Sequence, residues 1–381
     1  MNFSFRQTII CSLALLMLTT TLHAKEFLVY FGTYTEGLSK GIYVSRLDST
    51  TGRLTEPQLA ATTADPSYLA IAPDQKNLYA ANETSGPKNG SVSAFTMDRR
   101  SGQLTLLNQV DSGGISPCHV SVDAKGKTLL VANYNSGNIK AMPLAHGGAI
   151  ADGGSLVAYQ GHGINADRQA SPHAHFLATD PSNHFALGCD LGTDRVMIYR
   201  LNPADSALVA NDPPFASVPP GSGPRHVVFS RDGKFAYAVN EMGCSVTLFQ
   251  WDAKAGTLAP EETVSALPTG VTLQPAYTSA EILVHPNGKF VYVSLRGHDS
   301  ISVFAMDPET HRLTLIQNIP AGGKVPRGLA IDPTGHWLIA ANQKSDNVVE
   351  FAVDAATGKL TSTGTTFQVG SPVDVKFAKT L

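Results

Sequence analysis

The sequence predicts an all-β fold: a seven-bladed β-propeller with four-stranded antiparallel blades, the first of which is completed by the C-terminal strand. Two observations predict it. A unit of about 50 residues recurs along the chain. Each copy holds short stretches with the period-two apolar alternation of strands, whereas the 3.6-residue period of long helices is missing. Repeated short strands of this kind are typical of blades arranged around an axis.

The repeated unit begins with an apolar stretch, a Pro/Asp-x-Gly type of turn and a second apolar stretch that ends near Asn. A third, alternating strand follows and leads into a turn such as Asp-x-x-Thr-Gly. The clearest copies of the first two strands are LAIAPDQKNLYAANE from Leu69, VVFSRDGKFAYAVNE from Val227, ILVHPNGKFVYVSLR from Ile282 and LAIDPTGHWLIAANQ from Leu329.

The number of blades comes from the residue that ends the second strand of each unit. These residues recur roughly 50 positions apart, and seven units with four strands each follow from that spacing. They are Thr33, Asn82, Asn133, Asp190, Asn240, Leu295 and Asn342.

The two ends of the repeat array predict how the ring closes. The first unit starts at FLVYFGTYT and lacks an innermost strand, while the chain ends in SPVDVKFAKTL, which has the pattern of an innermost strand with nothing after it. We therefore expect the C-terminal strand to complete blade 1, which leaves no open sheet edge.

The first residues predict export. Arg6 precedes an apolar run, IICSLALLML, and small residues around Ala24 provide a cleavage site. We expect residues 1–24 to be a signal peptide and residues 25–381 to form the propeller. The apolar run is shorter than the roughly 20 residues of a spanning helix, so a membrane anchor is the less favoured alternative. The mature protein should be periplasmic or secreted, with no membrane anchor after cleavage.

Composition excludes several classes of partner and fold. The formal net charge of −3 argues against nucleic acid, which requires a basic face. Four cysteines in 381 residues are too few for a disulfide scaffold. A closed propeller needs no partner to bury its edges, so we expect a monomer.

The geometry of a blade predicts where a site would lie. Successive strands are antiparallel, so the start of the innermost strand and the end of the second strand meet at one mouth of the central channel. Equivalent innermost-strand positions are Ser67, Cys118, His175, Arg225, Ala280 and Arg327, followed in two blades by His119 and His226. The residues just after the second strands are Tyr34, Glu83, Tyr134, Leu191, Glu241, Arg296 and Gln343.

Several segments carry a more specific resemblance. SPCHVSVDAKGKTLLVANY, SPHAHFLATDP, GPRHVVFSRDGKFAYAVNE, SAEILVHPNGKFVYVSLRGHD and KVPRGLAIDPTGHWLIAANQ, with matches across the whole mature chain, resemble the seven-bladed lactonase family. That family contains the propeller-type 6-phosphogluconolactonases and the carboxymuconate lactonising enzymes. The resemblance implies a lactone as the small-molecule substrate, no cofactor, and an active site at the channel mouth.

The resemblance also implies the catalytic set, which is His175 in PHAH, Arg225 in GPRH, Glu241 in VNE and Arg296 in LRGHD. Opening a lactone ring requires an activated water and a stabilised oxyanion. His175 or Glu241 could be the base, and the guanidinium groups suit the oxyanion. The expected substrate-binding residues are Tyr34, Glu83, Tyr134, His173, His226 and Arg327, the last of which could bind a phosphate or carboxylate.

Each of these residues also has a plainer interpretation. An Arg and a Glu at a blade end often form a structural ion pair. His173 and His175 alternate along one strand, so both should face one way, and such a pair can ligate a metal; with no third ligand at a fixed spacing we expect no metal site. The recurring Asn residues could suggest a calcium ring but more simply cap turns. Cys118 is expected to be a small buried thiol, not a nucleophile.

Three functions remain open at this stage. The first is hydrolysis of a sugar lactone, and export favours an unphosphorylated aldono-1,5-lactone over the 6-phosphate, which is a cytosolic intermediate. The second is a lactonising enzyme that acts on muconates. The third is a non-catalytic exported propeller that binds a glycan or a protein. Two segments, AHGGAIADGG after Leu144 and ALPTGVTLQPAY from Ala266, are expected to set substrate specificity.

Overall fold

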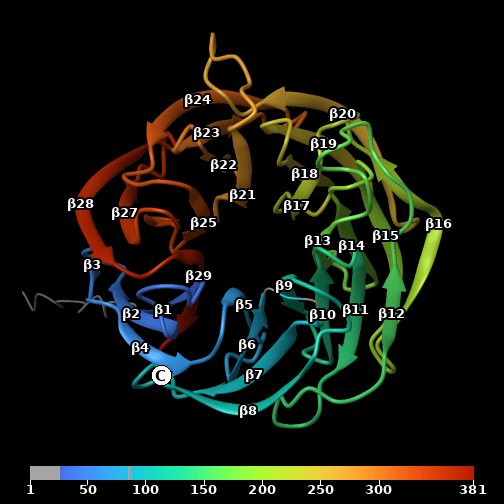
Figure 1. Ribbon diagram of the computed structural model, residues 1–381. Helices are drawn as coiled ribbons and strands as arrows, with labels where there is room; N and C mark the ends of the chain where they lie inside the picture. Colours follow the sequence, from blue (N-terminus) through green and yellow to red (C-terminus); the bar gives the residue numbers. More distant parts are fainter. Residues whose placement is uncertain (1–25, 85, 87) are drawn as a thin grey trace, which may run out of the picture.

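The computed structural model describes residues 26–84, 86 and 88–381, so the predicted signal peptide lies outside it. The described chain is all β, and its seven antiparallel sheets stand as blades around a central channel (Figure 1). The predicted seven-bladed propeller is therefore confirmed. Within these residues no helix is long and apolar enough to cross a membrane.

The strands follow one another outward in each blade after the first. Blade 1 contains β1 (Glu26–Thr33), β2 (Gly41–Asp48), β3 (Arg53–Leu54), β4 (Gln58–Thr62) and β29 (Pro372–Lys379). Blade 2 contains β5 (Pro66–Ile71), β6 (Asn77–Asn82), β7 (Ser91–Met97) and β8 (Leu104–Asp111). Blade 3 contains β9 (Pro117–Val122), β10 (Thr128–Asn133), β11 (Asn138–Pro143) and β12 (Ser155–Ala158). Blade 4 contains β13 (Ala174–Thr179), β14 (Phe185–Asp190), β15 (Arg195–Asn202) and β16 (Ala207–Ser217). Blade 5 contains β17 (Pro224–Phe229), β18 (Phe235–Asn240), β19 (Ser245–Asp252) and β20 (Thr257–Ser265). Blade 6 contains β21 (Thr278–Val284), β22 (Phe290–Arg296), β23 (Ser300–Met306) and β24 (Leu313–Pro320). Blade 7 contains β25 (Pro326–Ile331), β26 (Trp337–Asn342), β27 (Asn347–Val353) and β28 (Leu360–Gln368).

The C-terminal strand closes the ring as predicted. Figure 1 shows β29 on the channel side of β1, and the two strands pair antiparallel with Val375 opposite Phe31. The outermost strand of blade 1 is split into β3 and β4, which both pair with β2. The second strands end where the repeat predicts in six blades, while β22 continues one residue further, to Arg296.

The hydrophobic core lies between adjacent blades. All six residues of β6, β10 and β14 are buried, because these strands are covered by neighbouring blades on both faces. Aromatic side chains fill the outer part of this space; Phe185 of blade 4, for example, meets Trp251 of blade 5 edge to face, with 5.7 Å between ring centroids. Each large side chain buried in this way contributes roughly 1.5–3 kcal/mol.

Every innermost strand has a β-bulge near its mouth end. In six blades the second residue of the strand has no partner of its own; in blade 4, for example, Ala174 pairs with Asp190 and Phe176 pairs with Cys189. In blade 1 the extra residue is Val373, and in blade 6 Ala280 and Glu281 together face Ser294. A bulge redirects the side chains around it. The residues at these bulges in blades 2 to 7 include all those expected at innermost-strand starts, namely Ser67, Cys118, His175, Arg225, Ala280 and Arg327.

Candidate active site at the channel mouth

The residues after the second strands are fixed to the channel mouth by a repeated backbone hydrogen bond. The N–H of Glu241 donates to the carbonyl of Gly223, one residue before the innermost strand of the same blade (2.7 Å). Glu83, Tyr134 and Gln343 make the equivalent bond in blades 2, 3 and 7. This bond places each of these side chains next to the bulge of its own blade.

Glu241 is the centre of a buried ion cluster. Its Oε2 lies 2.8 Å from Nη2 of Arg296 and 3.2 Å from Nε of Arg225, and its Oε1 lies 2.7 Å from Nη2 of Arg168. Arg168 also donates to the hydroxyl of Tyr134 (3.3 Å). Three of the four expected catalytic residues therefore meet in one contact network.

The arginines of this cluster stabilise the charge of Glu241 against the effect of burial. Burial acts to raise the pKa of Glu241, but Arg296, Arg225 and Arg168 outweigh it and lower the pKa to about 2. Burial lowers the pKa of Arg296 to about 10, against the opposing effect of Glu241. Glu241 is therefore ionised at every working pH, and both of its oxygens are engaged by cations.

A second polar group consists of Tyr34, Glu83 and Arg327. The Tyr34 hydroxyl donates to Oε2 of Glu83 (2.7 Å), and Nη2 of Arg327 lies 3.4 Å from the same oxygen. The Arg327 guanidinium also lies over the Tyr34 ring, 5.4 Å from its centroid. Burial is the main cause that raises the pKa of the Tyr34 hydroxyl, so this group stays a hydrogen-bond donor.

His175 is a buried and neutral imidazole. Its ring lies 5.5 Å from Tyr134 and 5.3 Å from His226, centroid to centroid, in both cases edge to face. Burial, followed by the charge of Arg225, holds the pKa of His175 well below its usual range. Its Nδ1 is buried without a hydrogen-bond partner among the described residues. A buried polar atom of this kind is available to a water or a ligand.

His173 also contacts Tyr134, but from the segment that precedes β13 and not from the strand itself. Only His175 belongs to β13, where it lies at the bulge, so the expectation that the two histidines alternate along one strand is wrong. His173 precedes β13, stacks on the ring of Tyr134 at 4.5 Å, and places Nδ1 3.1 Å from the Tyr134 carbonyl. Both histidine rings therefore lie against Tyr134, His173 stacked on it and His175 edge to face.

The residues after the bulges fill the channel below the mouth. The ring of His226 lies 5.4 Å from His119, 5.6 Å from Tyr68 and 5.6 Å from Phe176. Four blades thus contribute an aromatic layer that forms a floor beneath His175 and Arg225. His226 touches the cluster above it, because Nη1 of Arg225 lies 3.2 Å from its Nε2.

Sequence reasoning missed one charged residue of the Glu241 cluster, Arg168, and three charged residues in the channel below the site, Glu281, Asp374 and Lys376. Arg168 lies in the 159–173 connection between blades 3 and 4, where no strand pattern indicated it. Glu281, Asp374 and Lys376 lie on innermost strands, and the first two directly follow bulges, as His119 and His226 do. The signal for Glu281 and Asp374 was a carboxylate within an otherwise apolar innermost strand.

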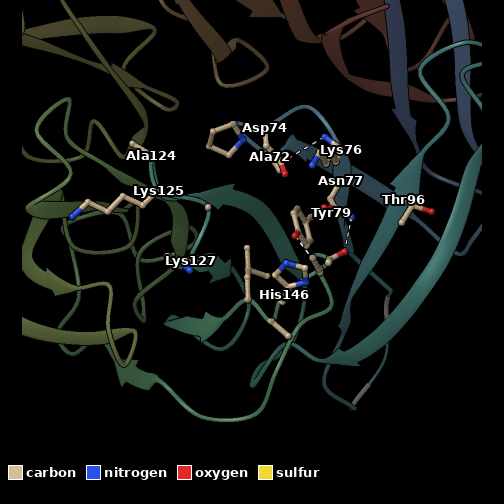
Figure 2. A pocket seen from close by; sticks show the side chains of 16 residues that line it. Ala72, Asp74, Lys76, Asn77, Tyr79, Thr96, Ala124, Lys125, Lys127 and His146 are labelled. Atoms are coloured by element: carbon tan, nitrogen blue, oxygen red, sulfur yellow. Dashed lines mark hydrogen bonds between the residues drawn. The ribbon is translucent and has the colours of Figure 1, made fainter. Parts of the chain in front are cut away.

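The two expected specificity loops lie on opposite faces. The 266–277 segment leads into β21 and reaches the mouth. The 144–154 segment follows β11, which runs away from the mouth, so a role for it at this site is wrong. It instead borders a cavity of about 470 Å³ on the far face, with His146, Lys76 and Lys127 in its lining (Figure 2). The buried Arg and Glu groups described above lie at the mouth and do not line this cavity.

The structure also shows the surroundings of Cys118, of the recurring Asn residues and of the possible metal ligands. Cys118 is buried, its Sγ lies 3.6 to 3.8 Å from three carbonyl oxygens, and burial raises its pKa, as expected of an inert thiol. Asn82, Asn133 and Asn342 each donate to a backbone carbonyl in the preceding interblade segment. Among the described residues no three His, Cys, Asp or Glu side chains are grouped as a metal site.

Comparison with known proteins identifies the family. Residues 28–377 match the family described as lactonase, 7-bladed beta-propeller. A protein of Bacillus subtilis named 6-phosphogluconolactonase is 37% identical over 92% of this chain and 98% of its own length. Another of that name, from Formosa agariphila, is 32% identical over 87% of this chain and 94% of its own. Among solved structures, the periplasmic gluconolactonase PpgL of Pseudomonas aeruginosa is 34% identical, with a TM-score of 0.88 over 93% of this chain and 100% of its own. The chain therefore belongs to the seven-bladed β-propeller lactonase family.

Proposed function

We propose that this protein is an exported lactonase that hydrolyses an aldono-1,5-lactone at the channel mouth. The observation that carries the proposal is the charge balance of the site. Four guanidinium groups and the carboxylates of Glu83 and Glu241 lie at the mouth, next to the neutral imidazole of His175. Lys376, Asp374 and Glu281 lie in the channel below them, so the whole group carries an excess of one positive charge when all its members are ionised. Such a site favours a reaction in which an anion develops on a neutral substrate.

The reaction assigns a role to each group. A water attacks the lactone carbonyl carbon and gives its proton to His175, while Arg225 and Arg296 stabilise the oxyanion. The tetrahedral intermediate then collapses, the bond to the ring oxygen breaks, and the imidazolium returns the proton to that oxygen. The product is a ring-opened hydroxy acid, which ionises to a carboxylate.

Glu241 is a positioning residue in this proposal. A carboxylate whose pKa is about 2 and whose oxygens contact three guanidinium groups is a poor proton acceptor. It holds Arg225, Arg296 and Arg168 around one point instead. This assignment favours His175 as the base.

The Tyr34, Glu83 and Arg327 group supports a polyhydroxylated substrate. A carboxylate, a phenol and a guanidinium offer both acceptors and donors to sugar hydroxyls. Glu83 would also repel a phosphate close to Arg327. Together with the predicted signal peptide at 1–24 and the periplasmic relative PpgL, this favours an unphosphorylated lactone and a periplasmic or secreted enzyme.

The test is hydrolysis of glucono-1,5-lactone and of its 6-phosphate by purified 25–381 in a pH-stat with EDTA, corrected for spontaneous opening. We expect turnover that survives EDTA, with the neutral lactone preferred. Arg225→Ala should lower kcat/KM at least about 100-fold, the scale of a lost oxyanion donor. Arg200→Ala, which removes a guanidinium bonded to Asn211 in the outer part of blade 4, is the control. Absence of turnover on both lactones would overturn the proposal in favour of muconate lactonisation or a binding propeller.

A further inference from the structure

The deepest charged contact of the site joins Arg225 to blade 6 through His226. Arg225, His226 and Glu281 are 2%, 1% and 5% exposed. Nη1 of Arg225 lies 3.2 Å from Nε2 of His226, and Nδ1 of His226 lies 2.9 Å from Oε1 of Glu281. The three side chains form a continuous chain from the channel floor to the mouth.

The hydrogen-bond directions in this chain are fixed by its first member. A guanidinium can only donate, so Nε2 of His226 must accept and cannot carry a proton. Nδ1 therefore carries the proton and donates it to the carboxylate of Glu281. Burial, followed by the charge of Arg225, lowers the pKa of His226, which agrees with a neutral ring.

Glu281 is itself held in place by its own blade. The blade 6 bulge sets Ala280 and Glu281 together opposite Ser294. The Ser294 hydroxyl accepts the N–H of Glu281 (2.9 Å), and Oε1 of Glu281 accepts the N–H of Ile282 (3.2 Å). The carboxylate is thus a fixed point against which His226 is oriented.

The arrangement determines which part of Arg225 remains free. Nη1 donates both to His226 and to the carbonyl of Ala280 (2.6 Å), so its two hydrogens are used. Nε faces Glu241. Nη2 has no hydrogen bond to any described residue. It is also absent from the unpartnered polar atoms that are fully buried, so it keeps some accessible surface. Only this nitrogen is left for a substrate.

We propose that Glu281, acting through the Nδ1–H tautomer of His226, is a positioning residue that holds Arg225 with Nη2 directed to the reacting carbonyl. This proposal rests on the proposed lactonase activity. Glu281 touches no substrate; it acts through His226 on the orientation of one guanidinium. Misplacement of a catalytic group by about 1 Å can cost about 100-fold in rate.

The test compares Glu281→Leu with Glu281→Gln. Gln keeps an oxygen that can accept from both His226 and Ile282, whereas Leu keeps the approximate volume and loses the acceptor. We expect kcat on glucono-1,5-lactone to fall about 10- to 100-fold in Glu281→Leu, with KM within threefold of the wild type. Glu281→Gln should restore kcat to within about threefold of the wild type.

The matched control is Asp374→Asn. Asp374 is the buried carboxylate that follows the bulge of blade 1, and it binds the N–H of Leu69 and Lys376, not His226. We expect it to keep kcat within about threefold. An equal loss of kcat in Asp374→Asn and Glu281→Leu would indicate general channel packing and overturn the proposal, as would normal kcat in folded Glu281→Leu.

A second measurement does not depend on activity. Histidine side-chain ¹⁵N shifts of the wild-type protein, with His226→Gln used for assignment, should show His226 as the neutral Nδ1–H tautomer. An Nε2–H tautomer or an imidazolium of His226 at pH 7 would overturn the proposed hydrogen-bonded chain from Glu281 to Arg225, even if Glu281→Leu does not fold. Absence of wild-type turnover combined with the Nδ1–H tautomer would refute the lactonase proposal and leave the hydrogen-bonded chain in place.

Discussion

Glu241 and Arg296 belong to neighbouring blades, yet Oε2 of the first lies 2.8 Å from Nη2 of the second. The same oxygen is shared with Arg225 of blade 5, and the other oxygen is taken by Arg168 from the connection between blades 3 and 4. One carboxylate therefore organises cations from three parts of the ring. This relationship separates the two candidate bases, because Nδ1 of His175 has no hydrogen-bond partner among the described residues, whereas both carboxylate oxygens of Glu241 contact guanidinium groups.

Replacement of His175 tests its role as the base. His175→Gln should lower kcat about 100- to 10,000-fold, the usual contribution of general base catalysis. Because the pKa of His175 is lowered well below 6.5, the active neutral form persists as pH falls through 6.5. We expect kcat/KM of the wild type to stay level from pH 8 to about pH 6 and to drop only at more acidic pH. An inflection near pH 6.5 that vanishes in His175→Gln would contradict the lowered pKa, and unchanged kcat in folded His175→Gln would contradict the role of His175 as the base.

Glu83 tests the recognition of substrate hydroxyls. Glu83→Gln removes the charge that Tyr34 and Arg327 contact, so binding of a neutral sugar lactone should weaken. We expect KM for glucono-1,5-lactone to rise roughly 10-fold, the scale of one hydrogen bond to a charged group, with little change in kcat. The control is Glu262→Gln, which removes a carboxylate paired with Arg312 on the outer strand β20. A large fall in kcat with unchanged KM would place Glu83 in the chemistry instead.

Glu241 should make stability depend on acid pH. Its pKa is about 2 in the folded protein against an ordinary 4.5, so its stabilisation is present above pH 4.5 and is lost as pH falls toward 2. At about 1.4 kcal/mol per pKa unit, the contribution is up to ~3 kcal/mol. Urea unfolding should show Glu241→Gln less stable than the wild type at pH 7, by an amount that shrinks toward pH 3. A difference independent of pH would mean that the charge is not responsible.

Glu350 should act in the opposite direction. This residue of β27 is 1% exposed, its Oε1 has no hydrogen-bond partner among the described residues, and burial raises its pKa from 4.5 to about 7. Its carboxyl is neutral in the folded state at low pH, so stability is lost as pH rises from 4.5 to 7. Glu350→Gln should therefore be more stable than the wild type at pH 8, by about 1–3 kcal/mol, and similar to it at pH 4. Equal stability at both pH values in urea unfolding would refute the raised pKa.

The sequence predicted the positions of the site better than their orientations. Arg225 and Arg327 were found as equivalent positions by counting back from a turn, and both lie at bulges. The count succeeds because each blade repeats one hydrogen-bond register. It could not reveal the bulge or the start of β13, so His173 and His175 were expected to alternate along one strand, whereas His173 precedes that strand.

The amino-acid sequence by itself determined the seven blades, the closure by the C-terminal strand and the ring of side chains at one mouth, because all three follow from local periodicity and strand direction. Only the tertiary structure decided that Arg168 completes the Glu241 cluster and that Glu281 lies against His226. Those contacts join residues 73 and 55 positions apart in the chain. Such distances are set by ring closure and by irregular connections, which no repeating pattern encodes.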